Sequence, residues 1–560
     1  MVPINDIDHA KHLKFHENDR MKHTATDSSS KKQTESFKET FESIVMAFIL
    51  AFVFRAFIVE AFVIPTGSMA PTLMGQHADV TCPQCGYNFE SDVPKTGIYK
   101  TPTVEEPYTA TLTCPMCSYP IKIDALNQVR PGDRILVHKF IYNFSEPKRW
   151  DVVVFKNPAE PQANFIKRLV GLPDEKLFII DGNIYTQPNA EPDSPWQIQR
   201  KTQREIVQRT VWQPVYHSAF YPLDEGASPD RENQWQFPWV ADMPQSIKRV
   251  NRTWLQYDGS TPTRLDFDYK QLSTSQVNIF NKSVNNAIGW YPYNQLTGEK
   301  SNEPIEDIRI AIKVVPEPKA DIAKQGVGLT FMTTGRTDGL IAVPIRAVID
   351  QKGKITIATS SNESPDTWQQ RATSQIQPLP LDRASLVEFW FVDQQVSLWV
   401  DGQRISTWEY DVPIQKLIQR PGAPIFPQTS VQIQGVAATI TQLDLDRDLY
   451  YSSGPNPYRK ALGVLYKTGS DRHGEPAMLQ TDQFYCLGDN SPSSSDGRFW
   501  TDVNPWIEQR MLSDKKQVTG VVPRELMIGK AFFVYFPAPH RLTPTTMGII
   551  PNFGDVRFIH

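Results

Sequence analysis

The sequence predicts a mostly β chain with one N-terminal membrane helix, and three observations lead to this prediction. Short runs of β-branched and aromatic residues recur through the chain, bounded by turn signals such as PGD at residues 131–133. Proline supplies 45 of the 560 residues. This exceeds the roughly 5% of an average protein and favours loop-rich β architecture. A single long apolar stretch lies near the N-terminus, at residues 41–65.

Composition narrows the classes of function. Hydrophobic residues make up 40% of the chain and charged residues 21%, as in globular proteins. At about 150 residues per domain, the length predicts three or four domains. The net charge of −4 provides no basic field, so no nucleic-acid partner is expected. Five cysteines are too few for a scaffold built on disulfides.

The N-terminal region divides into a polar tail and an apolar segment. Residues 1–38 are predicted to form a disordered cytoplasmic tail and residues 39–60 a transmembrane anchor. The longest uncharged run is shorter than the ~20 residues that a spanning helix needs, so Glu42 and Arg55 must lie at the two interfaces. A buried or interfacial helix is the alternative. Seven Lys and Arg residues precede the segment, and the positive-inside rule therefore places the rest of the chain outside the cytoplasm.

Beyond the anchor, the strand-like runs predict a β core interrupted by insertions. The core is predicted at residues 61–81, 128–186 and 480–545. The insertions are a four-cysteine module at 82–127, an irregular segment rich in Trp, Pro and Gln at 187–304, a β-sandwich at 305–450 and a return linker at 451–479.

The predicted sandwich rests on strand-like runs that recur at sandwich spacing. The hairpin at residues 386–402 resembles those of laminin-G and concanavalin-like jelly rolls. Such sandwiches often bind sugars, although many have no known ligand, so an envelope or glycan ligand is one interpretation. A purely structural insert is the alternative.

Two residue patterns in the core carry nucleophilic chemistry. Ser68 follows Gly67, which permits a tight turn that exposes a hydroxyl. Lys167 shares a strand face with apolar neighbours, and burial lowers the pKa of a lysine so that its neutral amine can accept a serine proton. A Ser/Lys dyad is one interpretation. An ordinary loop serine and a surface lysine are the alternative.

A third pattern, GDNSPSSSDGR at residues 488–498, combines turn-forming residues with two aspartates and an arginine. Asp496 and Arg498 are predicted to pair and hold the loop. Ser494 is predicted to hydrogen-bond Lys167 and orient its lone pair. A polar surface loop is the alternative.

Taken in order, these segments resemble the conserved boxes of type I (bacterial) signal peptidases. The matching segments are SMAPTL at 68–73, GDRILVHKF at 132–140, RWDVVVFKNP at 149–158, FIKRLVGLP at 165–173, GDNSPSSSDGR at 488–498 and VPRELMIGKAFFVYFP at 522–537. The resemblance implies an anchored serine endopeptidase on the outer side of the bacterial plasma membrane. Its expected partners are the lipid membrane and preproteins, which it would cleave after small residues at −1 and −3.

The same resemblance implies a role for each matching site residue. It makes Ser68 the nucleophile, Lys167 the general base and Thr66 an oxyanion-hole hydroxyl beside the Ser68 N–H. Ser494 would orient the lysine, and the loop would be shaped by Asp489, Asp496 and Arg498. No catalytic cofactor is implied.

Four positions depart from the family pattern. Trp150 and Asp174 each stand where the family has a glycine, Ser491 replaces an arginine, and Gly497 replaces a serine. None belongs to the dyad, and they leave the geometry of the last loop open.

Four of the five cysteines form two CxxC pairs, Cys82 with Cys85 and Cys114 with Cys117. Two such turns together supply the four thiolates of a tetrahedral, structural zinc site. Two disulfides are the alternative, because the module is predicted to lie in an oxidising space.

Two further functions compete with the peptidase interpretation. One is a self-cleaving Ser/Lys protein of the repressor type, which the membrane segment and the order of the boxes disfavour. The other is an envelope-binding protein with a degenerate peptidase. The presence of Ser68, Lys167 and Thr66 disfavours it.

Overall fold

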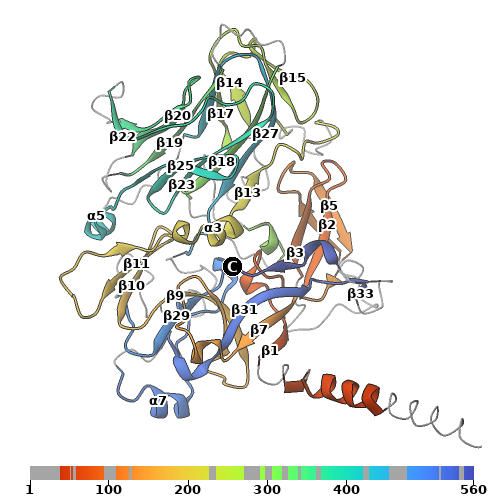
Figure 1. The fold of residues 1–560 in the computed structure, drawn as a ribbon, viewed down its shortest axis with the longest axis vertical. Helices are drawn as coiled ribbons and strands as arrows, with labels where there is room; N and C mark the ends of the chain where they lie inside the picture. Colours follow the sequence, from red (N-terminus) through yellow and green to blue (C-terminus); the bar gives the residue numbers. More distant parts are fainter. Residues whose placement is uncertain are drawn as a thin grey trace, which may run out of the picture. The chain divides into compact units, whose positions relative to one another are not determined.

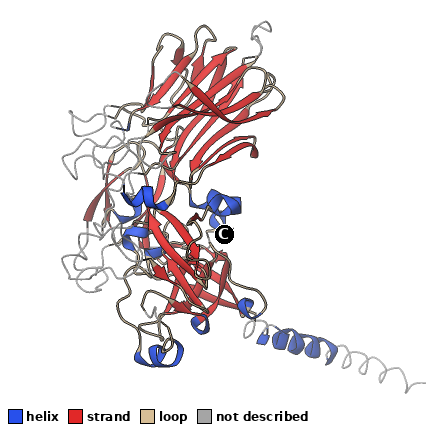
Figure 2. Cartoon of the chain, turned by 90° about the vertical axis from the view of Figure 1, so that its left-hand side faces the viewer, coloured by secondary structure: helices blue, strands red, loops and turns tan. Residues whose placement is uncertain are grey.

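The computed structural model describes most of the chain and forms two compact units, Met1–Val59 and Glu60–His560. The described residues are 38–50, 52–53, 58–93, 109–124, 129–225, 235–269, 291–296, 305–317, 326–337, 342–360, 367–419, 428–452, 476–515, 519–541, 548–550 and 552–560. Strands predominate among them, which confirms the prediction of a mostly β chain (Figures 1 and 2).

In the first unit, residues 38–50 and 52–53 are helical. Large apolar side chains on this helix are exposed, among them Phe48, Leu50 and Phe52. Within the described residues, no helix is both long enough and apolar enough to cross a membrane. Residues 51 and 54–57 of the predicted anchor, and residues 1–37 of the predicted tail, lie outside the described part.

The core of the second unit is an eight-stranded sheet in the order β1-β7-β31-β8-β9-β29-β30, with β34 paired to β31. The strands are β1 (Val59–Val63), β7 (Arg134–Lys139), β8 (Val152–Lys156), β9 (Asn164–Gly171), β29 (Gln483–Leu487), β30 (Val522–Pro523), β31 (Met527–Phe536) and β34 (Arg557–Phe558).

Strand β8 is apolar on both faces, which explains its central place in this sheet. Val153 and Phe155 pack into one hydrophobic cluster, while Val152 and Val154 pack into another on the opposite face. Successive side chains of a strand point to opposite faces. The continuous apolar run therefore fits a strand with a hydrophobic layer on each side.

A second sheet of four strands, in the order β12-β11-β10-β28, extends the core. Its strands are β10 (Glu175–Ile180), β11 (Asn183–Pro188), β12 (Gln197–Ile198) and β28 (Ala477–Met478). Two short helices add Val207, Val211 and Ile507 to the hydrophobic cluster that contains Val153 and Phe155 of β8. They are α3 (Glu205–Val211) and α7 (Pro505–Met511).

The large insertion forms a sandwich of two antiparallel sheets that share one hydrophobic core. One sheet has the order β15-β16-β27-β18-β23-β24-β25, with β13 on β27. Its strands are β13 (Gln213–Tyr216), β15 (Ile247–Arg249), β16 (Leu255–Tyr257), β18 (Ile308–Pro316), β23 (Ser385–Val392), β24 (Gln395–Val400), β25 (Gln403–Glu409) and β27 (Ala438–Arg447).

The other sheet has the order β14-β17-β26-β19-β20-β21-β22. Its strands are β14 (Trp239–Ala241), β17 (Thr263–Phe267), β19 (Val327–Gly335), β20 (Val343–Ile349), β21 (Lys354–Ser360), β22 (Trp368–Gln375) and β26 (Ser430–Gly435). A short helix, α5 (Ile414–Gln419), follows β25. Figure 2 shows the strands of both sheets in red.

The segment predicted to be irregular, 187–304, contributes five strands to this sandwich, which corrects that prediction. Strands β13 and β16 pair with β27, and β17 pairs with β26. The five strands are only three to five residues long, too short for a clear alternating pattern in sequence. Strands β13, β16 and β17 pair with β26 or β27, which lie far away in the sequence, so tertiary pairing decides their conformation.

The cysteine module consists of two antiparallel hairpins. Strand β2 (His77–Thr81) pairs with β3 (Asn88–Asp92) and with β6 (Val129–Arg130), and β4 (Thr109–Thr113) pairs with β5 (Pro120–Asp124). The buried side chains of the module belong to the same hydrophobic cluster as the sandwich. The indole N–H of Trp235 also donates to the carbonyl of Met116 at 3.1 Å.

A remaining two-stranded sheet, β32 (His540–Arg541) with β33 (Gly548–Ile550), lies near the end of the chain.

Candidate active site

Ser68 lies in a single turn of 3₁₀ helix, η1 (Gly67–Met69), that follows β1. Its side chain is 9% exposed. Thr66 precedes the turn in extended conformation and makes no side-chain capping hydrogen bond. It is exposed at the surface. The turn therefore presents a shielded serine hydroxyl directly beside an accessible threonine.

Lys167 occupies β9, between β8 and β29, and its side chain is 4% exposed. Its Nζ lies 2.7 Å from Ser68 Oγ and donates to the Ile166 carbonyl at 3.1 Å. A neutral amine has two N–H groups and one lone pair. With one N–H on the carbonyl, the lone pair remains for the serine proton.

The pKa of Lys167 is lowered from 10.5 to about 8. The main cause is burial, which disfavours the ammonium form. The negative charge of Asp496 opposes this shift but does not cancel it. A substantial fraction of Lys167 is therefore the neutral base near pH 8.

The segment that follows β29 forms hydrogen bonds with the chain around Ser68 and Lys167. Asp489 accepts two hydrogen bonds from the Arg168 guanidinium, at 2.8 and 2.7 Å, and one from the Thr72 hydroxyl at 2.5 Å. The backbone N–H of Asn490 donates to the Ser68 carbonyl at 3.1 Å. Its side-chain Nδ2 donates to the Gly67 carbonyl at 2.9 Å. Both carbonyls around the nucleophile are thus held by Asn490.

Asp496 and Arg498 form a buried, bidentate ion pair with distances of 2.9 and 2.7 Å. Burial alone would raise the pKa of Asp496, but the charge and hydrogen bonds of Arg498 outweigh it and lower the pKa. The pair fixes the loop, because Asp496 also accepts from the Gly488 N–H at 2.9 Å.

Ser494 is buried and lies beside Asp496, where its hydroxyl helps to lower the pKa of that carboxyl. The hydrogen bond to Lys167 expected from the sequence is not formed. Its Oγ instead lies close to Gly488, where a Cβ would come within 2.2 Å of it.

Sequence reasoning missed two residues of this site, Arg168 and Asn490. Arg168 points away from Lys167 on its strand, which hid its bidentate contact with Asp489, 321 positions along the chain. Asn490 lies in the segment GDNSPSSSDGR at 488–498, and its place in that segment was the signal that could have identified it.

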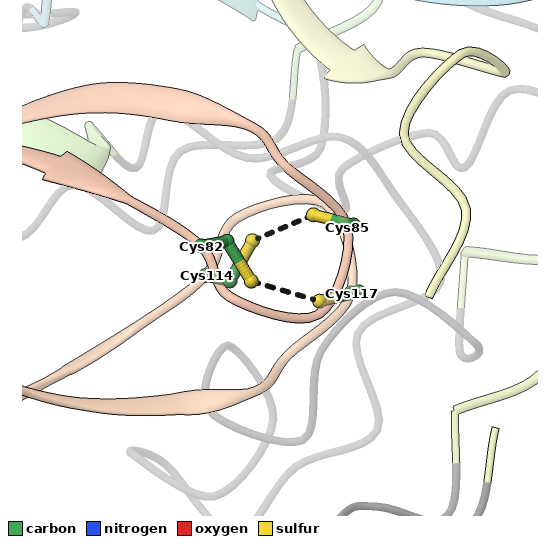
Figure 3. Close-up of side chains that lie close together, drawn as sticks. All are labelled: Cys82, Cys85, Cys114 and Cys117. Atoms are coloured by element: carbon green, nitrogen blue, oxygen red, sulfur yellow. Dashed lines mark hydrogen bonds between the residues drawn. The ribbon is translucent and has the colours of Figure 1, made fainter. Parts of the chain in front are cut away.

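The four cysteines of the predicted zinc site meet as the sequence predicts (Figure 3). Cys82 Sγ lies 3.5 Å from Cys117 Sγ, and Cys85 Sγ lies 3.5 Å from Cys114 Sγ. All four sulfurs lie within 4.8 Å of one another. These separations exceed the ~2.05 Å of a disulfide, and all four cysteines are free.

The arrangement of the sulfurs fits one metal ion held between two similar turns. Tetrahedral zinc with Zn–S bonds of about 2.3 Å requires sulfurs about 3.8 Å apart. In each turn the residue after the second cysteine, Gly86 or Ser118, donates its N–H to the carbonyl of the first. Both residues have positive φ. The two hairpins can therefore supply a closed shell of four thiolates.

Comparison with solved structures gives only weak likenesses. A carbohydrate-binding module, CBM66 from Bacillus subtilis, covers 36% of this chain and 95% of its own, with 10% identity and a TM-score of 0.20. The VIP36 exoplasmic/lumenal domain covers 43% and 92%, with 8% identity and a TM-score of 0.23. These TM-scores are too low to support a shared ligand, so a glycan ligand for the sandwich stays a prediction.

Comparison with known sequences identifies the region that contains the dyad. Residues 37–91 and 113–226 match the family model "Signal peptidase, peptidase S26". Signal peptidase I of Rickettsia typhi (strain ATCC VR-144 / Wilmington) is 30% identical over 154 residues, which cover 28% of this chain and 45% of the relative. That of Rickettsia bellii (strain OSU 85-389) is 25% identical over 162 residues, covering 29% and 43%.

The chain thus spans less than half the length of these curated relatives. The matched region contains both Ser68 and Lys167. The matched region of this chain, which contains the Ser68/Lys167 dyad, is thus similar to the signal peptidase family, peptidase S26.

Proposed function

We propose that this protein is a membrane-anchored serine endopeptidase that removes signal peptides from exported preproteins. The observation that carries the proposal is the 2.7 Å contact between Ser68 Oγ and a buried Lys167 Nζ. The similarity of residues 37–91 and 113–226 to the signal peptidase family supports this class of substrate.

Acylation begins when Ser68 Oγ attacks the carbonyl carbon of the scissile bond. Its proton passes to the lone pair of Lys167 Nζ as the new C–O bond forms. Lys167, now an ammonium, returns that proton to the nitrogen of the leaving mature chain, and the C–N bond breaks. The signal peptide remains as an ester on Ser68.

The oxyanion that forms during attack needs hydrogen-bond donors. We assign this role to the Ser68 N–H and the Thr66 hydroxyl, because such donors act on charge that develops only in the transition state. Lys167 then removes a proton from a water molecule, which attacks the ester carbon; the bond to Ser68 Oγ breaks, the Lys167 ammonium returns the proton to that oxygen, and the signal peptide is released with a free carboxylate. Asp489, Asp496, Arg498 and Ser494 shape the loop beneath the dyad.

The site is proposed to work at the outer surface of a bacterial plasma membrane. The exposed apolar side chains at residues 41–53 support insertion of that segment into lipid, because the bilayer core favours such surface. Small residues at −1 and −3 of the preprotein would enter pockets near Thr66, Ser68 and Phe165.

We infer a structural role for zinc bound by Cys82, Cys85, Cys114 and Cys117. Four thiolates leave no open coordination position for catalysis. Replacing both Cys82 and Cys114 by Ser should abolish zinc binding and lower the melting temperature of the purified chain. Unchanged zinc content, measured by atomic emission, would contradict this role.

The experiment that tests the proposal is cleavage of a preprotein with an Ala-x-Ala site by the detergent-solubilised full chain. Ser68→Ala and Lys167→Ala should each lose activity, on the order of 10⁴-fold, because each removes one half of the dyad. Gel mobility and mass spectrometry of the products locate the cleaved bond.

Lys176→Ala provides a matched control, because this lysine lies outside the site and contacts Gln187. It should cleave like the wild type. A folded wild type that leaves the preprotein intact would overturn the proposal and favour the envelope-binding alternative.

A further inference from the structure

A short segment of the large insertion contacts the catalytic loops directly. Residues 291–296, which we call the strap, lie between β17 and β18 and contain one 3₁₀ turn, η5 (Pro292–Asn294). Three of its side chains, Tyr291, Tyr293 and Asn294, are buried. Nothing in the peptidase boxes indicates this segment.

Asn294 makes a reciprocal pair of amide hydrogen bonds with Asn490. Its Nδ2 donates to Asn490 Oδ1 at 2.7 Å, and Asn490 Nδ2 donates to its Oδ1 at 2.8 Å. Both residues are almost fully buried. The second N–H of Asn490 Nδ2 reaches the Gly67 carbonyl at 2.9 Å, beside the nucleophile. Asn294 and the Gly67 carbonyl together therefore fix the orientation of the Asn490 amide.

The two tyrosines of the strap surround this contact. The Tyr293 ring lies against Gly67, where an added Cβ would come within 2.2 Å of the ring, and the Tyr293 hydroxyl donates to the Gln76 carbonyl at 3.3 Å. The Tyr291 hydroxyl donates to the Asp489 carbonyl at 3.3 Å. The strap thus contacts both chain segments that must meet around Ser68.

We propose that Asn294 is a positioning residue for the Ser68 nucleophile and acts through Asn490. This inference rests on the proposed function of the dyad. Without the amide of Asn294, the buried Asn490 Oδ1 loses its donor, and only the hydrogen bond to the Gly67 carbonyl still holds the Asn490 side chain. A buried oxygen without a partner is costly, so Asn490 shifts, and its hold on the turn that keeps Ser68 Oγ near Lys167 weakens.

The direct test compares Asn294→Ala with Gln295→Ala in the full chain. Gln295 neighbours Asn294 and makes two hydrogen bonds to the backbone of Thr113 in the cysteine module, not to the catalytic loops. Asn294→Ala should lower kcat about 10- to 100-fold with little change in KM, because small misplacement of a reacting group has effects of this size. Gln295→Ala should keep kcat within about twofold of the wild type, since it leaves the amide pair intact.

A double-mutant cycle with Asn490→Ala separates positioning from general destabilisation. If Asn294 acts through Asn490, adding Asn294→Ala to Asn490→Ala lowers kcat by less than about twofold further. Multiplicative losses would overturn the inference, as would an unchanged kcat in Asn294→Ala. Asn294→Asp keeps the shape of the side chain but removes its donor, and it replaces the alanine variant if that variant does not fold.

Acylation of Ser68 by p-nitrophenyl acetate separates this inference from the proposed substrate. The acetyl group passes to Ser68 Oγ, and p-nitrophenolate is released and followed by absorbance. The rate should fall in Asn294→Ala and not in Gln295→Ala. A wild type that is acylated but cleaves no preprotein overturns the substrate class alone. Equal acylation rates in wild type and Asn294→Ala overturn the role of Asn294.

Discussion

Two lysines of this protein are buried to a similar extent and behave in opposite ways. Lys167 Nζ contacts a serine hydroxyl and a backbone carbonyl. Lys201 Nζ forms ion pairs with Asp393 at 2.7 Å and Asp448 at 2.9 Å. Burial lowers the pKa of both, but only for Lys201 do the two carboxylates reverse the shift and raise it.

The difference shows that burial alone does not determine the charge of a lysine. A buried ammonium persists where carboxylates contact it and offset its desolvation, and its pKa falls where only neutral groups contact it directly. Lys201 begins the 3₁₀ turn η3 (Lys201–Arg204) that leads into α3, and its aspartates belong to the sandwich insertion. One lysine thus serves proton transfer, and the other connects two parts of the fold.

The largest expected effect separates the two lysines by activity. Lys167→Met should lower kcat on the order of 10⁴-fold, because no other base contacts Ser68 among the described residues. Its melting temperature should be equal to or higher than that of the wild type at pH 7, since a costly buried amine is removed. A clear loss of thermal stability would contradict the view that Lys167 is held at an energetic cost.

Lys201→Met should show the opposite pattern. It leaves Asp307, Asp393 and Asp448 clustered without their cation, and breaking such a buried pair costs about 3–5 kcal/mol. Urea denaturation should reveal this loss, while kcat of the folded fraction changes little. The comparison would fail if Lys201→Met lowered kcat as strongly as Lys167→Met.

A moderate effect is expected in the pH dependence of cleavage. The neutral amine of Lys167 is the active form, so kcat/KM should rise about tenfold per pH unit below its pKa and level off above about 8. Because the folded pKa lies below 10.5, the unfolded chain binds more protons between these values. The contribution of Lys167 to stability should therefore rise with pH in that window. A flat rate profile from pH 6 to 9, measured with the wild type, would assign the base to another group.

The smallest effect is expected at a backbone position that neither lysine contacts. Asp174 has a φ of 61°, a left-handed conformation that glycine adopts freely. Asp174→Gly relieves this strain, but it gives the unfolded chain more freedom and removes the hydrogen bond from Thr481. The net change in unfolding free energy should stay below about 1 kcal/mol. A loss of several kcal/mol in urea denaturation would show that the side chain, not the backbone, determines this turn.

Two of the departures from the family pattern have a structural explanation. Trp150 and Asp174 stand where glycine is usual, and both have positive φ, 75° and 61°. The backbone conformation that calls for glycine is thus retained with other side chains. Trp150 is buried, its ring lies 5.5 Å from Lys201 Nζ, and its carbonyl accepts from Arg168. The sequence marked both positions as unusual but contained no signal for these contacts.

The sequence by itself determined the mostly β class, the clustering of four cysteines and the residue types of a Ser/Lys dyad. Short-range sequence patterns predict these features: turn signals, CxxC spacing and a lysine on an apolar strand face. Tertiary structure decided the five sandwich strands within residues 187–304, the hold of Asn490 on the carbonyls of Gly67 and Ser68, and the strap at 291–296. The strap and its catalytic partners are separated by about 200 residues. Local sequence periodicity does not predict such contacts, because they form only when distant segments pack together and exclude water.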